Sequence, residues 1–226
     1  MKYKSIFSTK IARYLLKCGT NRKKDQSYFL YRLSQEQLSH ITLPLGSFTK
    51  EEIRDKARSY GLEVAEKPDS QDFYEGDYNE LLQVSEKIGN IVDTDGKILG
   101  KHNGFWNYTI GQRKGLGIAA SEPLYVLELR SETNEVVVGF KDKTMHSKLT
   151  AVKTNWIPFD RLESKKKCFA KIRSTQIPTE ATIYPNDDGS VNVVFENMQK
   201  SIATGQSVVF YDDDLVLGGG IIDSVE

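Results

Sequence analysis

The chain has 226 residues, of which 38% are hydrophobic and 27% charged, and 31 basic side chains balance 31 acidic ones. This ordinary globular composition excludes a disordered chain, a collagen-like chain and a small disulfide-stabilised scaffold. No apolar run is long enough to cross a membrane, and the first residues lack the apolar core of a signal peptide. The two cysteines lie far apart without metal-ligand spacing, so we expect reduced thiols in a cytoplasmic protein.

Basic residues are concentrated in two segments of this neutral chain. Residues 1–24 hold eight Lys and Arg side chains and no acid, and residues 161–173 hold six against the single acid Glu163. Segregated charge of this kind can bind a polyanion. The alternative is that each segment is a solvated face of the fold.

Residues 25–62 are predicted to be helical. Over residues 25–41 the apolar side chains follow a helical spacing, and Ser34 and Gln37 have the spacing of a capping box. Residues 43–46 break this pattern. Thr49 is the expected N-cap of a second helix, which has acids in its first turn and Gly61 just after its end.

The remainder of the chain is predicted to consist of short strands. Asp95-Gly96 indicates a hairpin within residues 63–147, and the glycine-rich residues 111–118 indicate a loop. From residue 148 onward, strand-like runs recur about every ten residues, which favours a small antiparallel barrel or sandwich. Gly218–Gly220 is interpreted as a barrel corner, because no helix can open after it.

The residues by themselves predict no complete catalytic centre. No phosphate-binding glycine motif is present, and the three histidines, His40, His102 and His146, are scattered without companions at metal-ligand spacing. We therefore expect no metal site and no cofactor held by this chain. The pattern of residues alone predicts a soluble α+β chain with two basic segments.

Four sequence motifs follow one another along the chain: KDQSYFL (24–30), LPLG with TKEEIR (43–46 and 49–54), YTIGQRKGLGI (108–118), and GQS with LGGGII (205–207 and 217–222). In this order they resemble the bacterial tRNA-specific 2-thiouridylase family (MnmA type). The resemblance extends from before Lys24 to the C-terminus, and it implies an enzyme that replaces the 2-oxygen of the wobble uridine of tRNA with sulfur, using ATP and magnesium.

The resemblance also implies a three-part organisation. Residues 1–62 resemble the helical end of the family's ATP-pyrophosphatase domain, residues 63–147 a central mixed β-rich domain, and residues 148–226 a small antiparallel β-barrel. The family's SGGVDSS nucleotide loop is not found in the sequence. Tyr74 occupies the position of the cysteine that accepts sulfur in the family, and a phenol with a pKa of about 10 cannot carry a persulfide.

Contact with tRNA is what the resemblance transfers to this chain. Asp25 can equally be the N-cap of the first helix, and Gln206 can equally serve a turn before a strand. Ile172 lacks the aromatic ring that the family has at this position. The residues that match tRNA-contacting positions are Lys24, Asp25, Gln26, Lys171, Ile172, Arg173 and Gln206.

Two functions follow as alternatives. The chain is either the tRNA-binding C-terminal part of a 2-thiouridylase, catalytically incomplete alone, or a noncatalytic RNA-binding module. A third arrangement is a subunit of a split enzyme, with a sulfur-donor protein or a separate ATP-pyrophosphatase chain as a further partner. Cys18 and Cys168 match no functional position of the family, so a packing role is expected for both.

Overall fold

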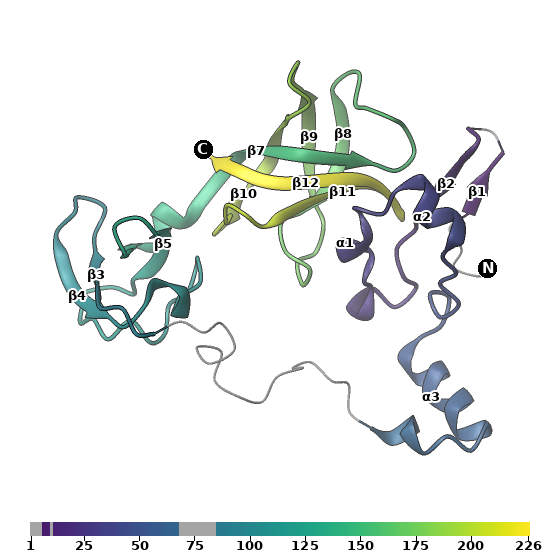
Figure 1. The fold of residues 1–226 in the computed structure, drawn as a ribbon, viewed down its shortest axis with the longest axis horizontal. Helices are drawn as coiled ribbons and strands as arrows, with labels where there is room; N and C mark the ends of the chain where they lie inside the picture. Colours follow the sequence, from purple (N-terminus) through teal and green to yellow (C-terminus); the bar gives the residue numbers. More distant parts are fainter. Residues whose placement is uncertain (1–5, 10, 68–84) are drawn as a thin grey trace. The chain divides into compact units, whose positions relative to one another are not determined.

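The computed structural model describes residues 6–9, 11–67 and 85–226, and it divides into two compact units. The first unit comprises residues 1–68, 147–198 and 203–226, and the second comprises residues 69–146 and 199–202. Figure 1 shows the elements of each unit in sequence colours. No helix in the described ranges combines the length and the apolar character that a membrane crossing needs.

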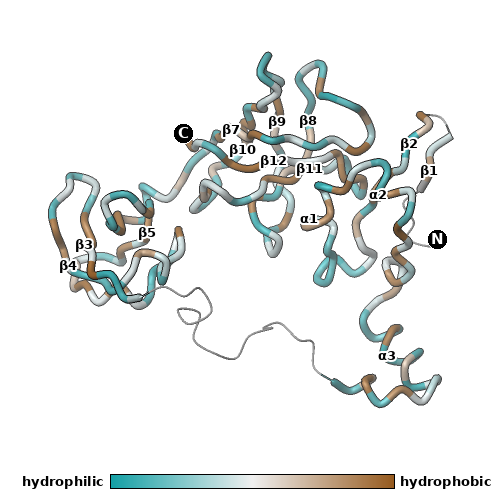
Figure 2. Tube along the Cα trace, in the orientation of Figure 1, coloured by the Kyte–Doolittle hydropathy of each residue, from teal (hydrophilic) through white to brown (hydrophobic). Residues whose placement is uncertain are grey.

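The first unit contains a closed six-stranded barrel, as expected from the regular spacing of strand-like runs. Its strands follow one another around the barrel in the order β10-β7-β12-β11-β8-β9, and the registered pairs are antiparallel. Figure 2 shows hydrophobic stretches along these strands and hydrophilic loops between them. The strands are β7 (Met145–Trp156), β8 (Lys166–Lys171), β9 (Thr179–Pro185), β10 (Val191–Lys200), β11 (Ser207–Asp212) and β12 (Leu215–Val225).

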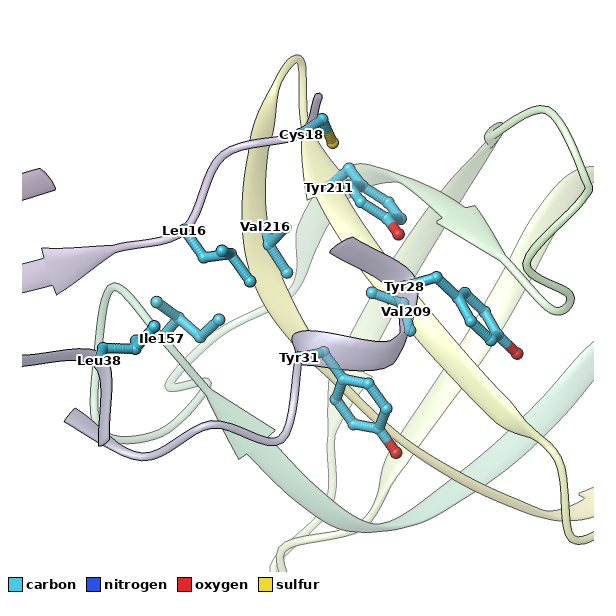
Figure 3. Close-up of a cluster of buried hydrophobic side chains, with 9 residues drawn as sticks. All are labelled: Leu16, Cys18, Tyr28, Tyr31, Leu38, Ile157, Val209, Tyr211 and Val216. Carbon is cyan, nitrogen blue, oxygen red and sulfur yellow. The ribbon is translucent and has the colours of Figure 1, made fainter. Parts of the chain in front are cut away.

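The N-terminal segment packs on this barrel and shares its core. A hairpin of β1 (Ile6–Ser8) and β2 (Arg13–Leu15) leads into a stretch that pairs with the β11–β12 turn, where the Cys18 N–H donates to the Asp214 carbonyl at 2.7 Å. Figure 3 shows the resulting cluster, in which side chains before residue 40 meet side chains of the barrel. Its buried members are Leu16, Cys18, Tyr28, Tyr31, Leu38, Ile157, Val209, Tyr211 and Val216.

The expected helix over residues 25–41 is interrupted. After the 3-10 helix η1 (Arg22–Lys24), the chain forms α1 (Ser27–Leu30) and then α2 (Gln35–His40). The helical spacing over residues 25–41 is thus divided between two short helices. Between them the Asn155 side chain, on β7, donates to the carbonyls of Tyr31 and Leu33 at 2.6 and 3.4 Å. These carbonyls face the barrel, and the next helix, α2, begins after its N-cap Ser34.

Both predicted helix starts are confirmed. Ser34 begins α2 with a complete capping box, in which its hydroxyl accepts the Gln37 N–H and the Gln37 side chain accepts the Ser34 N–H. Thr49 caps α3 (Lys50–Ser59) with Glu52 in the same way. Gly61 follows α3 at φ +66°, a conformation that glycine adopts without strain. The 3-10 helix η2 (Glu63–Glu66) comes next.

Close packing fixes α1 against the glycines of β12. A Cβ added at Gly219 would lie 2.8 Å from Cδ2 of Tyr31 and would also strike the Val208 carbonyl. Tyr31 is fully buried there, and its hydroxyl lies 3.1 Å from Oγ of Ser207. The Tyr28 hydroxyl donates to the Ser207 carbonyl at 2.7 Å. The glycines predicted as a barrel corner thus lie within a strand, at irregular pairing, and seat α1.

The second unit contains a four-stranded sheet in the order β4-β3-β6-β5, in which β3 and β6 run parallel. The predicted hairpin is confirmed: the Asp93 carboxylate accepts the N–H groups of Asp95 and Lys97, and Gly96 has φ +83°. The elements are β3 (Gly89–Val92), β4 (Ile98–His102), η3 (Phe105–Asn107), β5 (Tyr125–Arg130), β6 (Glu135–Gly139) and η4 (Lys141–Thr144).

Candidate nucleic-acid interface

A pocket of about 810 Å³ lies where the N-terminal segment meets the barrel in the first unit. Segments far apart in the sequence contribute to it: the stretch around η1 and α1, the end of β8 with its following loop, and the β11–β12 turn. Three residues that the resemblance marks, Asp25, Gln26 and Lys171, share this pocket. Its lining comprises Cys18, Arg22, Lys23, Asp25, Gln26, Phe29, Phe169, Lys171, Ser174–Pro178, Tyr211, Asp213 and Asp214.

The Lys24–Gln26 segment combines exposed and anchored side chains. Lys24 ends η1 and is exposed, as is Gln26, whose backbone is the N-cap of α1 without a side-chain capping bond. The Asp25 carboxylate is held inside the segment. Its Oδ1 accepts the N–H of Gly19 at 2.7 Å and that of Ser27 at 3.3 Å, and its Oδ2 accepts the Ser27 hydroxyl at 2.5 Å.

Lys171 is a buried cation at the end of β8, only 6% exposed. Its ammonium donates to the Ser174 carbonyl at 2.7 Å and lies 5.8 Å from the centre of the Tyr28 ring. Burial lowers the pKa of Lys171, and the nearby Asp25 and Cys18 oppose that effect. The ammonium is therefore fixed in position beside Asp25, unlike an ordinary surface lysine.

The neighbours of Lys171 differ in accessibility. The Ile172 side chain is buried, and its N–H donates to Oε1 of Gln176 at 2.9 Å. Arg173 is exposed and lies close enough to Tyr28 to lower its pKa, although burial dominates and raises that pKa to about 12. Arg173 therefore presents an accessible polar side chain, and Ile172 does not.

Gln206 lies outside the lining of this pocket. Its side chain is exposed in the turn before β11, while its carbonyl accepts the Ile222 N–H at 2.8 Å and its N–H donates to the Ala203 carbonyl at 3.3 Å. The backbone of Gln206 therefore serves the turn. The amide of its side chain is presented to solvent.

A second pocket, of about 900 Å³, collects the first part of the basic run. It lies between the β1–β2 hairpin and the β7–β8 loop, and its cations include Arg13, Arg161, Lys165 and Lys166. Some of this charge is compensated, since Arg13 contacts Asp160 at 2.5 Å. The basic run of residues 161–173 is thus divided between two pockets.

Neither cysteine has the environment of a reactive thiol. Both are unpaired and buried. Burial raises the pKa of Cys18 and raises that of Cys168 to about 12, so both thiols are protonated at neutral pH. This agrees with the packing role expected from the sequence. Tyr74, at the family's acceptor position, lies outside the described residues.

Among the described residues, no metal-ligand cluster is found, and the β12 glycines do not form a phosphate-binding loop. Within residues 6–9, 11–67 and 85–226, no three His, Cys, Asp or Glu side chains are grouped to hold a metal. The glycines of β12 pack against Tyr31 and lie within a strand, which is not the strand-to-helix loop that cradles phosphates.

Sequence reasoning missed the aromatic residues of the first pocket. Phe29 on α1 is 60% exposed and Phe169 on β8 is 37% exposed, and both line it. The helical spacing of Phe29 indicates a core side chain. For Phe169 the sequence did hold a signal. Side chains alternate along a strand, and Phe169 lies between the buried Cys168 and Ala170, so its ring must point away from the barrel interior.

Comparison with known proteins agrees with the motifs of the sequence. Three family models match successive parts of the chain: the tRNA methyl transferase HUP domain over residues 2–74, the tRNA methyl transferase PRC-barrel domain over residues 80–140, and the aminomethyltransferase beta-barrel domain over residues 146–222.

The curated relatives cover almost the whole chain. The chain is 49% identical over 218 residues to the tRNA-specific 2-thiouridylase MnmA of Endomicrobium trichonymphae, covering 96% of this chain and 61% of the relative. It is 49% identical over 217 residues to the MnmA of Acetivibrio thermocellus, covering 93% and 60%. This chain thus spans about three fifths of the length of these relatives. On these matches and on its α+β fold, the chain belongs to the tRNA-specific 2-thiouridylase family.

Proposed function

We propose that this chain supplies the tRNA-binding part of a uridine 2-thiolation enzyme. The observation that carries the proposal is the first pocket, because it brings together Asp25, Gln26 and Lys171 from segments about 145 positions apart. The names of the relatives give the reaction and the kind of RNA. Binding rests on cationic side chains that reach phosphates, and it requires no catalytic group in this chain.

The exposed cations of the first pocket and its border are suited to phosphate contact. Arg22 and Lys23 line the pocket and are exposed, and Lys24 and Arg173 are exposed beside it. Contacts from Lys and Arg to phosphates supply most of the nonspecific affinity for nucleic acids, and each releases a counterion. The buried Lys171 is suited to a fixed contact inside the pocket, and Ile172 to packing beneath it.

The test is the salt dependence of tRNA binding. The double variant Lys24→Ala/Arg173→Ala should bind tRNA more weakly, because two phosphate contacts are lost. The slope of log affinity against log salt should become shallower by about 1.4 to 1.8. Filter binding with unfractionated tRNA at several salt concentrations measures this slope. Lys97→Ala, an exposed lysine in the hairpin turn of the second unit, is the matched control and should leave the slope unchanged.

A slope that is equal in wild type and in the double variant would contradict the proposal. The basic side chains around the first pocket would then be a solvated face. Gln206→Ala separates charge from hydrogen bonding. We expect it to weaken binding without altering the slope, because a neutral amide releases no counterion.

We further propose that the chain by itself does not complete the thiolation reaction. The support is in the sequence, which has no glycine-rich phosphate motif and has Tyr74 where the family has its sulfur acceptor. Incubation with tRNA, ATP, magnesium and a persulfide donor should therefore yield no 2-thiouridine, as measured by mass spectrometry of digested nucleosides. Thiolated uridine formed by the purified chain would refute this expectation.

A split enzyme is the second candidate. In that arrangement the same chain acts together with a separate ATP-pyrophosphatase protein. Addition of such a protein to the incubation distinguishes the two candidates. Thiolation that appears only with both chains present would favour the split enzyme over an RNA-binding module that works alone.

A further inference from the structure

Two exposed aromatic rings lie in the lining of the first pocket. Phe29 comes from α1 and Phe169 from β8, and 60% and 37% of these residues are accessible. Phe169 pairs across the strands with Tyr211, a buried residue that lines the same pocket. Exposed rings in a polar, concave surface are the elements on which single-stranded nucleic acids stack their bases.

One polar group of this pocket, the Lys171 ammonium, is a fixed hydrogen-bond donor. The Lys171 ammonium has three N–H groups, and the Ser174 carbonyl accepts one of them. The Asp25 carboxylate is occupied by the Gly19 N–H and by Ser27, so its oxygens are largely used within the protein. A fixed ammonium with unused donors selects a ligand that carries carbonyl oxygens.

The charges along the lining differ between its two sides and would orient a bound nucleotide. Arg22 and Lys23, in η1, offer positive charge to a phosphate. Asp213 and Asp214, in the β11–β12 turn, repel one, and Asp214 is itself paired with Lys17 at 3.0 Å. The volume of about 810 Å³ is in the usual range for a small-molecule site and is suited to one nucleotide.

We infer that the pocket holds one unstacked keto base, that is, a base with a ring carbonyl (uracil, guanine or cytosine, but not adenine), from a single-stranded part of the bound RNA. The base ring lies against Phe29 and Phe169, and a ring carbonyl accepts a hydrogen bond from Lys171. The backbone phosphates follow the Arg22–Lys24 side. This inference rests on the proposed function and deepens it, since it names the part of the RNA that the pocket selects.

The experiment uses fluorescein-labelled heptanucleotides of adenosine, a base without a carbonyl, that carry one central uridine, guanosine, cytidine, adenosine or abasic site. Fluorescence anisotropy with the full chain gives each affinity. A central uridine, guanosine or cytidine should bind about three- to tenfold more tightly than a central adenosine, because only the keto bases offer a carbonyl to the ammonium. The abasic oligonucleotide should bind most weakly.

Two variants separate stacking from selection. Phe29→Ala should weaken binding of all base-containing oligonucleotides about five- to tenfold, because the stacking surface is lost. Lys171→Met retains the aliphatic stem and should abolish the preference for keto bases, and Lys171→Arg, which retains donors, should keep it. The controls are Phe140→Ala, an exposed ring of the second unit, which should have no effect, and Lys165→Met, a lysine of the second pocket, which should keep the base preference.

The outcomes distinguish this inference from the proposed function. If tRNA binds with the expected salt dependence but the central base and Phe29→Ala make no difference, the base pocket is refuted and the proposed function stands. If neither tRNA nor any oligonucleotide binds, the proposed function itself is refuted. Melting curves of each variant show whether it is folded, and Phe29→Ala, at an exposed position, should melt like the wild type.

Discussion

Burial shifts the pKa of several titratable side chains, among them Lys171, Cys18 and His102. Lys171 and Cys18 are close neighbours in the first pocket, where burial favours the neutral form of each. His102 lies in the second unit, 3% exposed, and its Nδ1 accepts the Gly104 N–H at 3.0 Å. That bond keeps the proton of the neutral ring on Nε2, and burial lowers the pKa of His102.

The lowered pKa of His102 predicts a loss of stability on acidification. The folded state disfavours the charged form of the His102 ring. The contribution of the neutral ring to the free energy of unfolding is therefore complete above the unfolded pKa of about 6.5. It is lost as the pH falls from there through the lower folded pKa. His102→Gln should therefore reduce the difference in the free energy of unfolding between pH 7.5 and pH 5.5, measured by urea denaturation. Equal pH dependence in wild type and His102→Gln would contradict the prediction.

At the scale of elements, short helices are held in place by contacts with the barrel. Helix α1 has only four residues, too few to be stable alone. It is fixed by Tyr31 against Gly219, by the Tyr28 hydroxyl on Ser207, and by Asn155, which binds the carbonyls at its end. The position of α1 in turn places Phe29 and Gln26 at the first pocket.

Gly219→Ala should therefore destabilise the first unit. The added methyl would strike the Val208 carbonyl of β11 and would lie 2.8 Å from Cδ2 of Tyr31, so that β11 or α1 would have to move away from it. Overpacking of this kind costs about 1–3 kcal/mol. Urea denaturation measures the loss. The control is Gly100→Ala in β4, where the nearest heavy atom would lie at an ordinary 3.4 Å, so its stability should change little. Equal stability of Gly219→Ala and wild type would show that α1 is not held by this contact.

At the scale of the whole molecule, residues 13–40 and the barrel share one hydrophobic core. Leu38 of α2 is fully buried in the same cluster as Ile157 and Val216 of the barrel. The second unit has a separate core around Ile91, Val126 and Val136. The N-terminal segment, although it matches a different family model from the barrel, therefore belongs to the barrel's folding unit.

Leu38→Ala should lower the free energy of unfolding of the first unit by about 2–5 kcal/mol, because a fully buried side chain leaves a cavity. Trp156, stacked on Phe210 in the barrel, reports this transition by fluorescence in a Trp106→Phe background. The matched variant Val136→Ala, in the core of the second unit, should leave the Trp156 transition in place. A barrel transition unaffected by Leu38→Ala would show that the barrel folds without the N-terminal segment.

The sequence by itself determined the features that depend on neighbouring residues. The capping boxes at Ser34 and Thr49 and the hairpin at Asp95-Gly96 are confirmed, because caps and tight turns are satisfied within a few residues. The strands of the barrel are confirmed for the same reason, since their alternation is local. The long motifs also determined the family.

Only the tertiary structure decided which side chains meet. The helical spacing continues through Tyr31, but the structure divides it between two helices, and Asn155 of the barrel binds the Tyr31 carbonyl between them. Lys171 and Ile172 are a basic and an apolar residue within a basic run of the sequence. Both are nevertheless buried, because β8 is enclosed by β11 and the N-terminal segment. The pocket that unites Asp25 with Lys171 and exposes Phe29 depends on the closure of the barrel, and such long-range packing leaves no trace in the spacing of residues.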